Sequence, residues 1–269
     1  MTDIDVVLSQ LTARYAELKE VEGVLLAGSR TTNLSDKNSD IDLYIYGKSI
    51  IPLEKRKIIL RDFSDQMEYN NQYWETEDDG YLRDPNIAID IVYRDLNWIL
   101  GELERVVLKH QAGTGYSTCI WFNFINSKIL FDRSGELAAL QKKFNIPYPH
   151  ELKLNIIKKN YPLLRESVCS YYRQIEKALG RNDFISVNHR TAAFFESYFD
   201  IIFAINETPH PGEKKLMKIV LSQCPRKPEN LENNVQAILS NINSSKKHML
   251  SALDELVDNL DILLQNENI

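Results

Sequence analysis

The sequence has few cysteines and no long apolar segment. Its 269 residues include three cysteines, Cys119, Cys169 and Cys224, which lie far apart and are odd in number, so neither a disulfide framework nor a Cys-x-x-Cys metal site is expected. No apolar run approaches the roughly 20 residues that span a bilayer. The first residues also lack the basic and apolar pattern of a secretion signal. We therefore expect a cytoplasmic protein without membrane contact.

The sequence also lacks an excess of basic residues. Lys and Arg number 32 against 38 Asp and Glu, which gives a formal net charge of -6. Because affinity for a phosphate backbone depends on basic side chains that release counterions, this balance argues against long nucleic acid as a partner. The five histidines show no metal-ligand spacing, so a separate histidine metal site is not expected.

Apolar periodicity divides the chain into an α/β part and a helical part. The predicted strands are residues 23–27, 41–46, 87–93, 118–124 and 128–131. The predicted helices of the same part are residues 4–18, 52–63, 94–110 and 135–144. Beyond Pro147 and Pro149, which favour an extended connection, the apolar spacing is helical. The expected fold is α/β, with a small mixed-sheet catalytic domain over residues 1–145 and an all-α bundle over residues 150–269.

Two aspartates open one of the predicted strands. Asp40 and Asp42 alternate with Ile41 and Leu43, so both carboxylates point to the same face of the strand. Neighbouring carboxylates repel each other unless a cation lies between them. Oxygen ligands without histidine or cysteine favour Mg²⁺, which proteins usually hold by one or two carboxylates together with substrate phosphates. The pair therefore predicts a magnesium site that binds a nucleoside triphosphate.

A glycine-serine turn and a third aspartate complete the predicted site. Gly28 and Ser29 follow a predicted strand, where a glycine lets the backbone approach a phosphate and the serine can donate its hydroxyl and amide. Arg30 can add a charge-assisted contact. Asp90 lies alone in an apolar predicted strand, where it can complete the metal site or take a proton from an attacking hydroxyl.

The spacing of these residues resembles that of the DNA polymerase beta-like nucleotidyltransferase superfamily. The resemblance rests on Gly28-Ser29, a loop of ten residues, Asp40-Ile41-Asp42, and Asp90 on a later strand. The two-part layout is similar to that of aminoglycoside and lincosamide nucleotidyltransferases. The resemblance implies an ATP·Mg²⁺ complex held at Asp40 and Asp42, a phosphate contact at Ser29, and Asp90 as third carboxylate or general base.

The resemblance implies that the protein transfers a nucleoside monophosphate, AMP from ATP, to a hydroxyl of a small acceptor. This acceptor can be aminoglycoside-like. Lys214 is the candidate for a basic residue that reaches the triphosphate from the helical domain, or is simply part of a solvated helix start. The acidic residues within 75–79 can attract a cationic acceptor, or can form a solvated loop. The alternatives are an antitoxin-like enzyme that modifies protein or RNA, and a catalytically silent nucleotide-binding module. A monomer or homodimer is expected.

Overall fold

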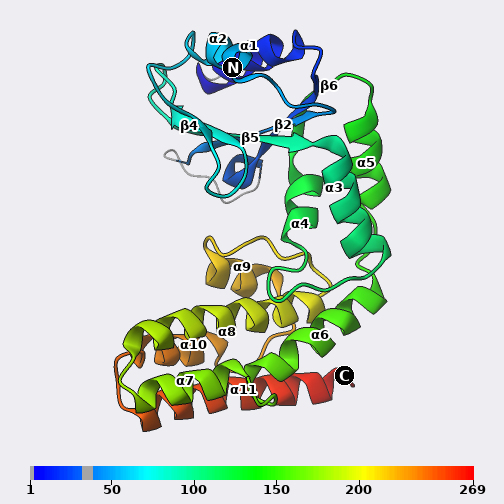
Figure 1. Ribbon diagram of the computed structural model, residues 1–269. Helices are drawn as coiled ribbons and strands as arrows, with labels where there is room; N and C mark the ends of the chain where they lie inside the picture. The colour runs from blue at the N-terminus through cyan, green and yellow to red at the C-terminus, as the bar shows by residue number, and fades with distance from the viewer. Residues whose placement is uncertain (1–2, 32–38) are drawn as a thin grey trace. The chain divides into compact units, whose positions relative to one another are not determined.

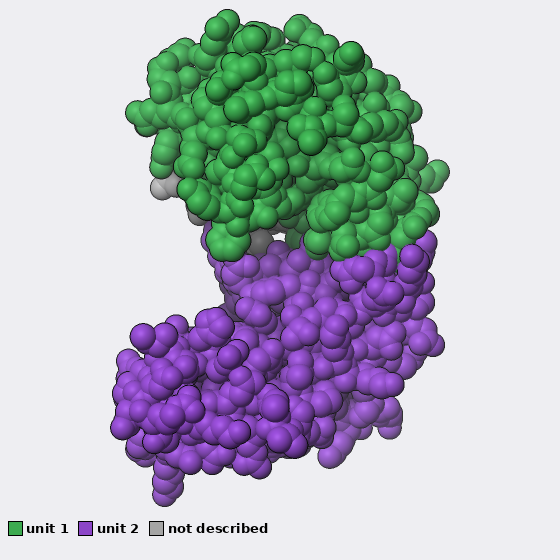
Figure 2. Space-filling model, viewed as in Figure 1, with its two compact units in different colours: residues 1–104, 120–146 green, residues 105–119, 147–269 purple. Residues whose placement is uncertain are grey.

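The computed structural model describes residues 3–31 and 39–269 and divides into two compact units. Unit 1 consists of residues 1–104 and 120–146, and unit 2 consists of residues 105–119 and 147–269 (Figure 2). The chain therefore passes from one unit to the other after residues 104, 119 and 146. None of the described helices combines the length and the apolar character that crossing a bilayer requires.

Unit 1 is built on a six-stranded mixed sheet (Figure 1). Its strands are β1 (Val21–Ala27), β2 (Ile41–Gly47), β3 (Gln66–Asn71), β4 (Glu77–Tyr81), β5 (Ala88–Asp95) and β6 (Lys128–Asp132), in the order β3-β4-β5-β2-β1-β6. Strands β2 and β5 pair in parallel, and the other described neighbours pair antiparallel. The predictions of strands at β1, β2, β5 and β6 are confirmed.

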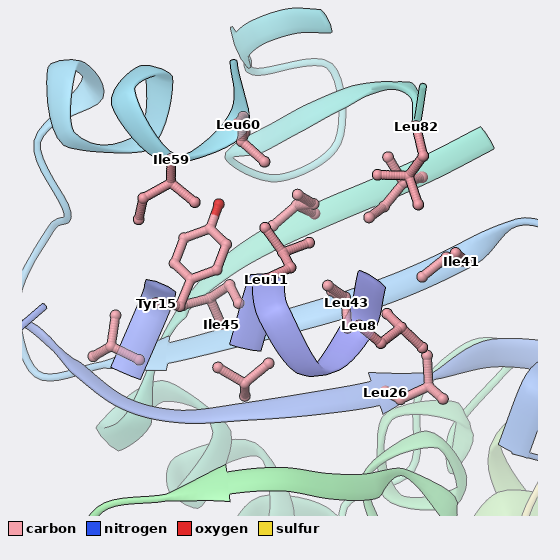
Figure 3. Packing of buried hydrophobic residues seen from close by; sticks show 14 of the residues in the cluster. Leu8, Leu11, Tyr15, Leu26, Ile41, Leu43, Ile45, Ile59, Leu60 and Leu82 are labelled. Atoms are coloured by element: carbon pink, nitrogen blue, oxygen red, sulfur yellow. The ribbon is translucent and has the colours of Figure 1, made fainter. Parts of the chain in front are cut away.

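Helices α1 (Asp3–Ala16) and α2 (Leu53–Leu60) lie over one face of this sheet (Figure 1). Their apolar side chains meet those of β2 and β5 in one buried cluster (Figure 3), which includes Leu8, Leu11, Tyr15, Ile41, Leu43, Ile45, Ile59, Leu60, Ile89 and Ile91. A 3₁₀ turn (Gly28–Thr31) follows β1. This cluster therefore occupies one face of β2 and β5, and the other face carries the buried side chains of Tyr46 and Val92.

Three more α-helices lie between β5 and residue 146. They are α3 (Leu96–Leu103), which continues into a π-helical turn (Glu104–Leu108), α4 (Cys119–Asn126) and α5 (Glu136–Phe144). The side chain of Asp95 caps α3 by accepting the backbone N–H groups of Asn97 and Trp98. The predicted helices at α1, α2, α3 and α5 are confirmed.

The segment 118–124 is helical, so its prediction as an edge strand is wrong. Within α4, Trp121 and Phe124 are three residues apart and are each 1% exposed. The indole Nε1 of Trp121 donates to the backbone oxygen of Phe144 at 2.8 Å. A short apolar run fits either a buried strand or a buried helix, and here the burial of two aromatic rings on one side of a helix decides the outcome.

Unit 2 is helical in its described residues. Its helices are α6 (His150–Leu164), α7 (Tyr171–Gly180), α8 (Phe184–Ile205), α9 (Leu216–Gln223), α10 (Leu231–Ser240) and α11 (Lys246–Asn266). The long helix α8 packs against both α6 and α7, and residues Ser197–Ile205 at its end are all buried. The predicted fold class, a mixed-sheet α/β part with an all-α bundle, is confirmed.

Candidate metal-binding site

The register of the sheet brings two of the predicted aspartates side by side. Asp42 on β2 is paired with Asp90 on the parallel strand β5, and Ala27 at the end of β1 is paired with Asp42 from the other side. Because side chains alternate along a strand, Asp42 and Asp90 share one face, while their neighbours Ile41 and Ile89 point into the core. The two carboxylates therefore lie on the face opposite α1 and α2.

Asp40 joins these two residues to form a cluster of three. Asp40, Asp42 and Asp90 are half-buried, and each offers one carboxylate oxygen that lies within 4.8 Å of the others. Ligand oxygens that surround Mg²⁺ at its preferred bond length stand about 3 Å apart when adjacent and about 4 Å apart when opposite. The spacing of the three carboxylates fits such an ion. Within residues 3–31 and 39–269 no other group of three His, Cys, Asp or Glu side chains has this spacing.

Gly28 lies directly against this cluster. Its φ is +67°, a conformation that L side chains rarely adopt, and a Cβ atom at this position would come within 1.8 Å of Asp42 Oδ2. The 3₁₀ turn that begins there is closed by the hydroxyl of Thr31, which donates to the Gly28 carbonyl at 3.0 Å. Only a glycine lets the chain turn this close to the Asp42 carboxylate.

Arg30 forms hydrogen bonds to the backbone just before β2. Its Nε donates to the backbone oxygen of Asp40 at 2.9 Å, and its Nη2 donates to the backbone oxygen of Ser39. These bonds tie the turn after β1 to the residue that carries the first carboxylate. The predicted phosphate contact of Arg30 stays a prediction. The side chain of Ser29 lies outside the described part of the structure, so its phosphate contact also stays a prediction.

A cationic side chain that the sequence reasoning missed lies on the same face of β5. Arg94 is four residues beyond Asp90, and its guanidinium stacks on the ring of Tyr44 at 3.9 Å and donates twice to Glu75, at 2.8 Å and 2.5 Å. The Tyr44 hydroxyl accepts a bond from Asn123 Nδ2 on α4 at 2.9 Å, and burial raises its pKa. Strand alternation from Asp90 was the signal that would have found Arg94.

The acidic run at 75–79 is divided between the two faces of the sheet. Asp78 is fully buried on the core side, where it accepts bonds from Arg56 Nη1 at 3.0 Å and from the Tyr93 hydroxyl at 2.7 Å. Asp79 is paired with Asp90, so it lies on the face of the carboxylate cluster, and burial followed by repulsion from Glu77 raises its pKa. The solvated-loop interpretation is therefore wrong for β4. Contact with an acceptor stays a prediction.

Lys214 lies in unit 2, in the turn that precedes α9. The next residue, Lys215, has φ +55° and forms the N-cap of that helix. The contact between Lys214 and a triphosphate stays a prediction.

Comparisons with known proteins give limited information on function. A family model described as a domain of unknown function (DUF4037) matches residues 118–216, a segment that contains none of the three carboxylates. Comparison with curated proteins gives no match. Among solved structures, the crystal structure of a nucleotidyltransferase-like protein from Exiguobacterium sibiricum 255-15 is similar with a TM-score of 0.37 and 12% sequence identity, over 97% of this chain and 78% of that chain. A likeness of this degree is too distant to assign a function.

Proposed function

We propose that the chain is a Mg²⁺-dependent nucleotidyltransferase that transfers a nucleoside monophosphate, AMP from ATP, to a hydroxyl of a small acceptor. The observation that carries this proposal is the cluster of Asp40, Asp42 and Asp90, of which one carboxylate oxygen each lies within 4.8 Å of the others. Gly28, the residue that would clash with Asp42 if it had a side chain, supports it from the 3₁₀ turn that follows β1. The proposal therefore rests on residues of this chain and not on its likeness to a known protein.

The charge of the cluster requires an explanation. Two unit charges about 4 Å apart interact with roughly 4 kcal/mol at an effective dielectric constant of 20, so three carboxylates at this distance repel one another strongly. A divalent cation converts that repulsion into attraction. Hard oxygen ligands of this kind suit Mg²⁺, which binds proteins through few carboxylates and completes its shell with water and phosphate oxygens. The donor set of this site therefore fits a magnesium-triphosphate complex.

Each residue has a separate part in the proposed reaction. Asp40 and Asp42 hold the metal, which when bound supplies positive charge at the reacting phosphate. The glycine turn at Gly28 lets backbone N–H groups approach the phosphates. Asp90 accepts the proton of the acceptor hydroxyl, whose oxygen forms a bond to the α-phosphorus while the bond to the leaving pyrophosphate breaks. Arg30 fixes the 3₁₀ turn relative to Asp40 by donating to its backbone oxygen.

Transfer is tested with ATP labelled at the α-phosphate. The full chain is incubated with this ATP, Mg²⁺ and a panel of hydroxylated metabolites, aminoglycosides, proteins and RNA, and mass spectrometry identifies what gains a nucleotide. Label on a small hydroxylated molecule, with release of pyrophosphate, is the expected result. Label on protein or RNA would favour the antitoxin-like alternative. Binding of ATP without any transfer would favour a silent nucleotide-binding module.

The metal requirement is tested by calorimetry. We expect ATP to bind at least about tenfold more weakly when Mg²⁺ is replaced by EDTA, because without the cation the carboxylates repel the triphosphate. Tenfold corresponds to about 1.4 kcal/mol. Equal affinity under both conditions would remove the metal site from the proposal, whatever the outcome of the transfer assay.

A further inference from the structure

The sheet face that carries the three carboxylates continues from β5 onto β4. Gly80 in β4 and Leu82 after it are directed to the core, since a Cβ at Gly80 would meet Met67 Sδ at 2.5 Å and Leu82 is 1% exposed. Because side chains alternate along a strand, Tyr81 between them lies on the opposite face, which is the face of Asp90. The ring of Tyr81 therefore shares a face with the proposed metal site.

Tyr81 is also close to the carboxylates along this face. It pairs with Ala88 on β5, and the pair two positions further is Asp79 with Asp90. Diagonal neighbours of this kind have Cα atoms about 7–8 Å apart, which an aromatic side chain can span. Ala88 carries only a methyl group and is half-buried, so β5 presents no large side chain between Tyr81 and Asp90. A molecule bound at Asp90 is thus within reach of the Tyr81 ring.

The ring of Tyr81 is open to solvent. Its side chain is 52% exposed, and it forms no hydrogen bond or ring contact with the residues that the structure describes. Single exposed apolar side chains are common on protein surfaces, so exposure alone assigns no function. The position of this ring beside Asp90 is what makes it available to a substrate of the site.

Two exposed polar side chains flank Tyr81 on the same face. Gln66 on β3 pairs with Tyr81 and Glu68 pairs with Asp79, whereas Met67 between them packs against the core. The amide of Gln66 both donates and accepts hydrogen bonds, and the carboxylate of Glu68 accepts them. An aromatic surface with a few such groups at its edge suits a ligand that has an apolar face and a rim of hydroxyl groups.

The strand order places this surface on the acceptor side of the site. The turn at Gly28, to which the proposed function assigns the phosphates, follows β1, and the strands lie in the order β4-β5-β2-β1. In phosphoryl transfer the attacking and the leaving oxygens lie roughly in line, on opposite sides of the phosphorus. With the pyrophosphate toward β1, the acceptor lies toward β4 and Tyr81.

We infer that Tyr81 is a specificity-determining residue for the acceptor, and that the acceptor is a cyclic polyol, a hydroxylated saturated ring such as a hexose or an inositol. The C–H face of the ring packs on Tyr81, and its hydroxyl groups bond to Gln66 and Glu68. The inference rests on the proposed function, because it names the acceptor of that reaction. Binding of the ring does not require transfer, so the two are tested separately.

Binding is measured by saturation-transfer difference NMR titrations of the full chain with Mg²⁺. The probes are methyl glucoside and myo-inositol, with sorbitol as the open-chain control. We expect at least one cyclic probe to bind at least about tenfold more tightly than sorbitol, which has hydroxyl groups but no preformed ring face. Tyr81→Ala should weaken this binding about tenfold, in the range for loss of an aromatic stacking surface. Tyr81→Phe should restore it.

Tyr73→Ala is the matched control for Tyr81→Ala. Tyr73 is a 75% exposed tyrosine of the same unit that precedes β4, at the end of that strand remote from Tyr81, so its replacement should leave the binding unchanged. In the transfer assay, Tyr81→Ala should raise the KM for the cyclic acceptor about tenfold and leave kcat and the KM for ATP within about twofold of the unmodified values.

The inference is overturned if neither cyclic probe binds, if sorbitol binds as tightly as they do, or if Tyr81→Ala binds as tightly as Tyr73→Ala. A rise in the KM for ATP in place of the KM for the acceptor would also overturn it, because the ring would then contact the nucleotide. Binding of a cyclic polyol that depends on Tyr81, without any transfer of a nucleotide, would support this binding site and refute the proposed function.

Discussion

The two units hold their aspartates in opposite ways. In unit 1, Asp40, Asp42 and Asp90 are half-buried and bring their oxygens within 4.8 Å of one another. In unit 2, Asp200 is 1% exposed and is surrounded by donors: it accepts bonds from the backbone N–H of Ser117 at 3.0 Å, from the hydroxyl of the same residue at 2.6 Å, and from Asn160 Nδ2 at 3.3 Å. Burial raises the pKa of Asp200 to about 7.

The difference separates a carboxylate that links segments of one unit from three carboxylates that form the proposed metal site. The donors around Asp200 come from α6 and from the segment between α3 and α4, so this residue ties that segment to α8. Its burial is compensated within the protein. Asp40, Asp42 and Asp90 instead bring three carboxylates to a common point, which is the proposed cation site. Substitutions in the two sets should therefore affect different properties.

The largest effect is expected for Asp42→Asn. The amide keeps the shape of the side chain but removes a metal ligand, so transfer should fall by about 10³-fold or more, the upper range for loss of one group that stabilises developing charge. The melting temperature should not fall, because one source of repulsion is removed. Steady-state kinetics and thermal melting measure the two properties.

Asp65→Asn is the matched control for this variant. Asp65 is an exposed aspartate of the same unit that pairs with Arg83 at 2.6 Å, and exposed pairs contribute little to stability. The control should transfer nucleotide at the rate of the unmodified protein. Full activity in folded Asp42→Asn would show that the carboxylate cluster has no part in the reaction.

The opposite pattern is expected for Asp200→Ala. Removing the acceptor leaves the backbone N–H of Ser117 buried without the carboxylate that it bonds and takes one of three acceptors from the amide of Asn160, so the free energy of unfolding should fall by about 3 kcal/mol. Transfer per folded molecule should stay unchanged. Urea denaturation and active-site titration together measure both. Loss of turnover with unchanged stability would mean that the distinction between the two units is wrong.

Gly28→Ala tests whether the position of the Asp42 carboxylate depends on a glycine beside it. The added Cβ would meet Asp42 Oδ2 at 1.8 Å, so the carboxylate must move and transfer should fall at least about tenfold. Gly135→Ala is the control, because its φ of +75° imposes a similar backbone strain but nothing lies within 4 Å of the added atom. Both variants should lose about 1 kcal/mol of stability. Equal activities would mean that the position of Asp42 does not depend on Gly28.

A pH dependence of stability is also expected in unit 2. The pKa of Asp200 is raised from 3.8 to about 7, so between these values the folded state binds more protons than the unfolded state. The stability contributed by this residue is therefore fully present below about pH 4, declines as pH rises, and is lost above about pH 7. The decline is at most about 1.4 kcal/mol per pH unit.

Asp200→Asn isolates this contribution, because asparagine does not titrate. The free energies of unfolding of the two proteins, measured by denaturant titration at pH 5, 6, 7 and 8, should show the unmodified chain losing stability relative to the variant up to about pH 7. A constant difference across this range would contradict the raised pKa of Asp200.

Part of the candidate site follows from the sequence, because strand alternation is a local property. The alternation of Asp40 and Asp42 with Ile41 and Leu43 was sufficient to place two carboxylates on one face, and the isolation of Asp90 in an apolar strand was sufficient to single it out. The parallel pairing of β2 with β5, which brings them together, is non-local. The sequence did not predict this pairing; the resemblance implied only that Asp90, on a later strand, is the third carboxylate.

The hairpin of β3 and β4 was not predicted, because β4 carries no apolar alternation and β3 carries only the two alternating side chains of Met67 and Tyr69. The sequences QMEYNN and EDDGY read as a polar stretch, yet they form strands by pairing with each other and with β5. Because β4 was not predicted, the sequence did not predict that Asp79 pairs with Asp90. It also did not predict that Asp78 forms a buried ion pair with Arg56. Pairing partners outside a segment decided its structure here.

The assignment of residues 105–119 to unit 2 was also beyond the sequence. No composition shift marks this segment, and its attachment depends on distant residues: the N–H of Gly115 donates to Asn160 Oδ1 at 3.0 Å, and Ser117 donates to Asp200. These partners lie 45 and 83 positions away along the chain.

The repeated passage of the chain between the units affects how the protein can change in evolution. Since unit 2 is assembled from residues 105–119 and 147–269, a single exchange of genetic material after residue 146 would leave Ser117 without the Asp200 that it evolved with. Replacing the helical unit as a whole requires two segments to be exchanged together. The two units should therefore be inherited jointly.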